Sequence, residues 1–213
     1  ALTAAIDLFG NDGNNRLTGT AFADALDGND GDDTYVVTTG DTALEAAGEG
    51  TDTIVALTDA TMVAAAMTSI EVAELASGVT LTVDVTHLET GAGGAGDLLD
   101  TVTGVDDDAT ETLAITGSTL GTTATLDLTS AVTFTNVVVD YRGGADIDTF
   151  TGTTAADIIS GGFGDDVLDG NGGSDTITGG EGDDTFTVEG NDSTSDIVVI
   201  TDYEVSDAVI ADE

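Results

Sequence analysis

The chain has 213 residues, with 42 acidic side chains against two arginines and no lysine, and a formal net charge of −40. This charge excludes nucleic acids and anionic membrane surfaces as electrostatic partners. The chain has no cysteine for a disulfide or a thiolate metal site, and it has no run of 18 apolar residues, so membrane insertion is not expected.

The first predicted element is a short array of nine-residue repeats, which we assign to residues 1–36. Its three units read GNDGNNRLT (10–18), GTAFADALD (19–27) and GNDGDDTYV (28–36). The sixth position is polar in each unit, as Asn15, Asp24 and Asp33, and the eighth position is apolar. The constant spacing predicts that each unit adopts the same local structure.

The middle segment, residues 37–142, contains no further clean nonapeptide. Apolar and polar residues alternate in several places, for example over 79–86, and this period of two predicts short strands with one buried face. Alanine and methionine between Ala60 and Met67 favour a single helical turn. We therefore expect an irregular, β-rich segment with little helix.

A second and longer array covers residues 143–187. Its five units follow one another without a gap and read GGADIDTFT, GTTAADIIS, GGFGDDVLD, GNGGSDTIT and GGEGDDTFT. The sixth position is always aspartate: Asp148, Asp157, Asp166, Asp175 and Asp184. The eighth position is always large and apolar: Phe150, Ile159, Leu168, Ile177 and Phe186. The remaining residues, 188–213, are expected to form capping strands.

The repeat has a direct physical interpretation. Glycine permits a tight six-residue turn, and the last three residues form a short strand with its central side chain pointing inward. Two units then make one coil of about 18 residues, and coils stack at the strand spacing of roughly 4.8 Å. Aspartates from units two apart lie above one another and repel by about 0.8 kcal/mol even in water. A hard divalent cation such as calcium turns this repulsion into coordination.

These units resemble the repeats-in-toxin (RTX) family, whose repeat GGxGxDxUx, with U large and apolar, forms a calcium-binding parallel β-helix. Units 161–169 and 179–187 match at every defined position. The resemblance implies an all-β fold, a right-handed parallel β-roll or β-solenoid, in which two RTX arrays flank an irregular β-solenoid segment. It also implies calcium as the bound ion.

The resemblance further implies which residues bind calcium. Units two apart share a site, which gives four pairs: Asp148 with Asp166, Asp157 with Asp175, Asp166 with Asp184, and Asn15 with Asp33. Asp24 occupies the same position of its own unit. Turn glycines supply backbone carbonyls, and these are Gly28, Gly31, Gly161, Gly162, Gly164, Gly179, Gly180 and Gly182. Asn15 is neutral, and the GTTAAD and GNGGSD turns depart from the consensus, so we expect weaker or empty sites there.

No motif indicates an enzyme. His87 is the only histidine, so a three-histidine zinc site is excluded, and the HExxH motif is absent. No motif around His87 supports a serine triad. Carboxylates this dense are typical of solvated turns or calcium ligands, and no sequence feature indicates the cleft that acid–base catalysis needs.

The sequence therefore favours a calcium-dependent extracellular structural protein. We expect a self-assembling surface-layer, filament, matrix or adhesin subunit that folds on binding calcium after one-step, type I export. Its expected partners are calcium ions and further copies of itself or of a cell-surface assembly, with a glycan as a further candidate. Two alternatives stay open: the calcium-folding secretion module of a larger secreted enzyme or toxin, and a stand-alone calcium-binding or ice-binding-type surface module.

Overall fold

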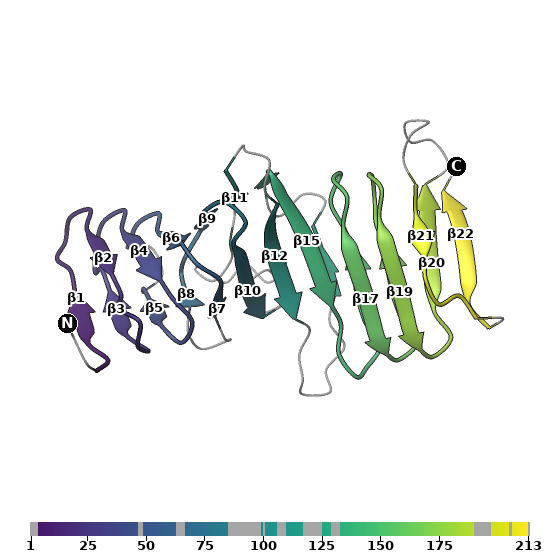
Figure 1. Cartoon of the computed structure of the whole chain (residues 1–213), viewed down its shortest axis with the longest axis horizontal. Helices are drawn as coiled ribbons and strands as arrows, with labels where there is room; N and C mark the ends of the chain where they lie inside the picture. The colour runs from purple at the N-terminus through teal and green to yellow at the C-terminus, as the bar shows by residue number, and fades with distance from the viewer. Residues whose placement is uncertain are drawn as a thin grey trace. The chain divides into compact units, whose positions relative to one another are not determined.

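The computed structural model describes residues 4–46, 49–62, 67–84, 99, 101–105, 110–116, 125–128, 133–189, 197–204 and 206–212. Within these residues the chain is all-β, and its named strands pair in parallel (Figure 1). The described residues include no helix long and apolar enough to cross a membrane. The chain divides into two compact units: Ala1–Leu113 with Val132–Val137, and Ala114–Ala131 with Val138–Glu213.

The first unit is a parallel β-solenoid, in which successive strands of one sheet come from successive coils. One sheet has the order β1-β3-β5-β8, from Asp7–Phe9, Ala25–Asp27, Thr42–Leu44 and Met67–Thr68. A second has the order β2-β4-β6-β9-β11-β14, from Arg16–Thr18, Thr34–Val37, Thr53–Ala56, Val72–Leu75, Thr101–Thr103 and Thr133–Thr135. The strands β7 (Ala60–Met62) and β10 (Thr80–Asp84) form a further pair, and β12 (Glu111–Thr116) lies at the division between the units.

The second unit is built in the same way and holds the longer array. One sheet has the order β13-β16-β18-β20-β22, from Thr125–Asp127, Thr149–Thr151, Val167–Asp169, Thr185–Glu189 and Ala208–Asp212. The other has the order β15-β17-β19-β21, from Val137–Arg142, Ile158–Phe163, Thr176–Glu181 and Val199–Ile200. Figure 1 shows β15, β17 and β19 side by side, in teal to green. The expected capping segment therefore contributes two strands to the solenoid.

The register confirms that each coil contains two nonapeptides. Phe150 lies opposite Leu168, and Leu168 lies opposite Phe186, a step of 18 residues each time. On the other sheet Ile159 lies opposite Ile177. Units two apart therefore stack directly, as the repeat period predicts.

The core is a thin column of inward-pointing side chains. In the second array every position-eight residue is at most 1 % exposed: Phe150, Ile159, Leu168, Ile177 and Phe186. Tyr141 extends this column and stacks on Phe150 with ring centroids 4.1 Å apart. Because each coil buries only a few apolar side chains, the turns must contribute to stability as well.

The middle segment follows one expectation and contradicts another. The alternation over 79–86 produces β10, with Leu81 and Val83 buried. The helical turn expected from Ala60 to Met67 is not formed at the described ends of this stretch, which are the strands β7 and β8, and residues 63–66 lie outside the described residues. Pairing with a neighbouring coil satisfies the backbone of β7 and outweighs the weak helix propensity of alanine and methionine.

Candidate metal centre

The position-six carboxylates form buried columns along the edges of the coils. In the second array Asp148, Asp166 and Asp184 lie in one column, and Asp157 and Asp175 lie in the other. Each of these five residues is at most 2 % exposed. A buried carboxylate needs hydrogen bonds or a cation, because burial removes its water shell.

In three of these carboxylates, one oxygen accepts a hydrogen bond from the preceding coil. Asp166 Oδ1 accepts the backbone N–H of Asp148 at 2.7 Å, and Asp184 Oδ1 accepts that of Asp166 at 2.9 Å. In the other column Asp175 Oδ1 accepts the N–H of Asp157 at 2.9 Å. The fold therefore brings together all three aspartate pairs predicted for the second array.

The other oxygen points into the turn, beside the glycine that opens the same unit. A side chain at Gly161 would meet both Asp166 Oδ2 and the carbonyl oxygen of Gly179, one coil further on. The same two oxygen types crowd Gly143 and Gly152. Asp166 Oδ2 is buried and has no hydrogen-bond partner. This arrangement costs the calcium-free protein stability unless a cation or proton is added.

The remaining turn glycines are needed for the conformation of the backbone. Their φ angles are positive, between 113° and 139°: Gly31, Gly162, Gly164, Gly180 and Gly182. A side chain at Gly164 would also collide with the backbone of Asp146 on the coil below. Asn171, which departs from the consensus, adopts φ = 64°, a conformation that asparagine tolerates better than most residues. The GNGGSD turn therefore keeps the left-handed conformation at its second position.

Turns that lack these glycines close in a different way, which we call the threonine clasp. In the GTTAAD turn, Thr153 donates its backbone N–H to Asp157 Oδ2 at 2.7 Å and its hydroxyl to the same carboxylate at 3.1 Å. In the GTAFAD turn, Thr20 donates both its N–H and its hydroxyl to Asp24. The clasp supplies the inward carboxylate oxygen with protein donors.

In the first array, Asn15 acts as a donor. Its backbone N–H and side-chain amide both donate to Asp33 Oδ1, at 2.5 and 3.2 Å. Asp33 Oδ2 is buried, lies beside Gly28 and has no hydrogen-bond partner. The structure thus brings Asn15 and Asp33 together, while the oxygen that needs a cation belongs to Asp33 alone.

The acidic columns continue beyond the repeats, which sequence reasoning missed. Asp52 accepts the N–H of Asp33 at 2.8 Å, and Glu71 accepts that of Asp52 at 2.8 Å. Asp41 accepts the N–H of Asp24, and Asp207 accepts that of Asp184. Their signal in the sequence is an acidic residue directly before a strand, as in the Asp-Thr-apolar triplets that begin at Asp41 and Asp52. Spacings of 17, 19 and 23 residues hide it from a search at period nine.

The pKa values reflect this burial. Burial raises the pKa of Asp52, Asp157 and Asp166 to about 6 in each case. At Asp24 burial also acts to raise the pKa, but hydrogen bonds from Thr20 and from a backbone N–H outweigh it and lower the pKa. Burial therefore outweighs the threonine donors at Asp157, whereas the same kind of donor prevails at Asp24.

The oxygens present fit calcium. In the described part of the chain no three acidic or histidine side chains converge into a cage, so an ion would be held by one or two carboxylates together with glycine carbonyls, an all-oxygen set that calcium accepts. Within those residues the one ion pair joins Arg142 to the exposed side of the sheet at Asp140, away from the columns. His87 lies outside the described residues.

Comparison with known proteins agrees with this geometry. A family model described as the RTX calcium-binding nonapeptide repeat matches the chain in four copies, over residues 9–42, 142–177, 151–186 and 164–193. The chain carries RTX calcium-binding repeats. The RTX matches cover both arrays, include every predicted position-six residue, and establish calcium as the ion that these repeats bind. No match was found among curated proteins or among solved structures.

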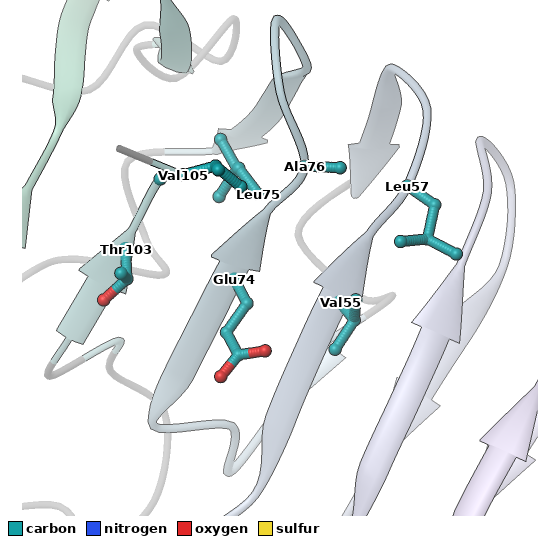
Figure 2. Close-up of a pocket in the computed structure, with 8 residues that line it drawn as sticks. Val55, Leu57, Glu74, Leu75, Ala76, Thr103 and Val105 are labelled. Atoms are coloured by element: carbon teal, nitrogen blue, oxygen red, sulfur yellow. The ribbon is translucent and has the colours of Figure 1, made fainter. Parts of the chain in front are cut away.

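A separate hollow lies on the outer face of the first unit. It measures about 300 Å³ and is lined mainly by apolar side chains of β6, β9 and the segment after β11, with Glu74 as its charged residue (Figure 2). Val55 and Glu74 are register partners on the neighbouring strands β6 and β9. Its polar side chains are Glu74 and Thr103, and the rest of its lining is apolar or backbone.

Proposed function

We propose that the chain is a calcium-dependent extracellular structural protein that is exported, folds on binding calcium and assembles with further copies of itself. Calcium binding by the RTX repeats is the established part of this function. Coupling to folding is supported by the buried columns, because a chain of net charge −40 must bring its carboxylates together in order to form its coils.

The observation that favours assembly is the end of the second unit. Among the described strands, β21 and β22 are each the last member of their sheet, so their outer edges have no strand partner there. Apolar side chains on these strands are about half exposed, including Val199, Val209 and Ile210. An exposed edge with apolar side chains is a surface onto which another β-strand pairs readily.

The proposed role is structural and not catalytic. The inward carboxylates are ordered by backbone and threonine donors and lie under stacked turns, an arrangement suited to binding ions between coils. The alternative secretion-module role predicts the same calcium-dependent folding but no assembly. Whether the calcium-bound, folded chain assembles therefore distinguishes the two roles.

A calcium titration followed by light scattering and electron microscopy tests the proposal. We expect millimolar calcium to produce fibres or sheets, and Ile210→Glu on β22 to prevent them while calcium binding persists. The matched control is Ile158→Glu, an equally exposed isoleucine on β17, which has strand partners on both sides. A chain that stays a folded monomer in calcium would refute the assembly and favour the secretion module.

A further inference from the structure

The column of opening glycines ends, in each array, at an acidic residue from the segment that follows. Gly28 lies directly after β3 and Glu45 directly after β5, and these strands pair in parallel with the two residues in register. Gly179 lies in β19, and Asp202 stands in the corresponding position beyond β21. Both arrays therefore end with a carboxylate where the next coil would have a glycine.

At the end of the first array this carboxylate faces the calcium turn. The N–H of Gly28 donates to Glu45 Oε1 at 2.7 Å and to the Tyr35 hydroxyl at 2.8 Å. The space beside Gly28 is filled by Asp33 Oδ2 and that same hydroxyl. Within an array, this place beside the aspartate oxygen is taken by a glycine carbonyl, as at Gly161. At Gly28 the Tyr35 hydroxyl takes this place, and the Glu45 carboxylate meets the same glycine at its backbone N–H.

One oxygen of Asp33 is left uncompensated by the protein itself. Asp33 is 1 % exposed and Glu45 is 7 % exposed, and Asp33 Oδ2 has no hydrogen-bond partner. In the described residues no ion pair joins Asp33 to a basic side chain. A buried oxygen without a donor, with a second buried carboxylate on the same glycine, is an arrangement that a calcium ion fits.

The end of the second array repeats the arrangement. Asp202 accepts the backbone N–H groups of Gly179 and Gly180, each at 2.9 Å. Asp184 Oδ2 lies beside Gly179. The position-six aspartate and the acid from the following segment again meet at one opening glycine.

We propose that Glu45 and Asp202 are additional calcium ligands, which complete the terminal site of each array together with Asp33 and Asp184. A second charged ligand raises calcium affinity, so these sites fill before those inside the arrays. Calcium then fixes the exposed end of each array to the segment that follows it. The proposal rests on calcium binding by the repeats and is independent of assembly.

Terbium, which occupies calcium sites and emits when a nearby tyrosine is excited, tests this site by site. The chain has three tyrosines and no tryptophan, so a Tyr141→Phe, Tyr203→Phe background leaves Tyr35 as the only sensitiser. In that background we expect Glu45→Gln to raise the terbium concentration at half-saturation by about tenfold or more. Asp30→Asn, which removes a charge from an exposed residue of the same turn, should change it by less than about twofold.

Glutamine keeps the oxygen that accepts the Gly28 N–H, so a purely structural Glu45 predicts no change. Equal half-saturation for Glu45→Gln and the parent, or an equal loss for Glu45→Gln and Asp30→Asn, would overturn the proposal. Tyr203 reports on Asp202→Asn in the same way, with exposed Asp183→Asn as control. If the parent chain bound neither terbium nor calcium, the failure would instead lie with calcium binding by the repeats.

Discussion

Replacing Asp166 with asparagine should have opposite effects with and without calcium. Asparagine keeps an oxygen for the Asp148 N–H, which Asp166 Oδ1 accepts at 2.7 Å. It removes the charge from Oδ2, which is buried and has no hydrogen-bond partner. Burial raises the pKa of Asp166 to about 6, and such a rise corresponds to a penalty of roughly 3 kcal/mol for the charged form at neutral pH. Without calcium, Asp166→Asn should therefore stabilise the fold by up to about this amount.

With calcium, Asp166→Asn should instead destabilise the fold, because Asp166 serves two predicted calcium sites, one with Asp148 and one with Asp184. An ion present at about one hundred times its dissociation constant stabilises the folded state by about 2.7 kcal/mol per site. Loss of two sites therefore costs up to about 5 kcal/mol in the free energy of unfolding. Far-UV circular dichroism during urea unfolding, in excess calcium and in chelator, measures both effects.

Asp157→Asn is the comparison, because the threonine clasp already supplies Asp157 Oδ2 with donors. We expect its effect on the free energy of unfolding to be similar in calcium and in chelator. The two variants could instead change stability by the same amount, both in calcium and in chelator. That result would refute the distinction between turns with and without the threonine clasp.

Three further outcomes follow from the turns. The calcium-free chain should gain β-structure as the pH falls from about 7 to 5. Burial raises the pKa of Asp52, Asp157 and Asp166 to about 6, so protonation in this range removes the cost of burying their charges. A circular dichroism signal in chelator that is flat over this range would contradict this prediction. Thr153→Val should cost about 1 kcal/mol with and without calcium, as judged by urea unfolding, because the clasp loses its hydroxyl. Gly164→Ala should destabilise by at least about 1 kcal/mol, because φ is 123° and the new methyl meets Asp146; an unchanged melting temperature would refute this.

The local features of the arrays were predictable because a strict period carries them. Phe150 and Leu168 recur 18 residues apart in equivalent positions, so their burial and their pairing follow from stacking two units per coil. The columns of position-six acids follow from the same stacking. Ala60–Met62 and Met67–Thr68, where a helical turn was predicted, are strands because propensity is a local preference, and pairing with a neighbouring coil overrides it.

The sequence by itself determined the repeat, the inward anchors and the chemistry of the ion, since each of these depends on residue type at a fixed interval. Only the tertiary structure decided which acids extend the columns, because Asp52 and Glu71 reach them across irregular loops that no period describes. It also decided which carboxylates lack donors. Asp157 and Asp166 occupy the same repeat position. The threonine clasp gives Asp157 Oδ2 a donor, whereas Asp166 Oδ2 has none and is free to bind a cation. That difference depends on which donors the folded turn brings within hydrogen-bonding distance.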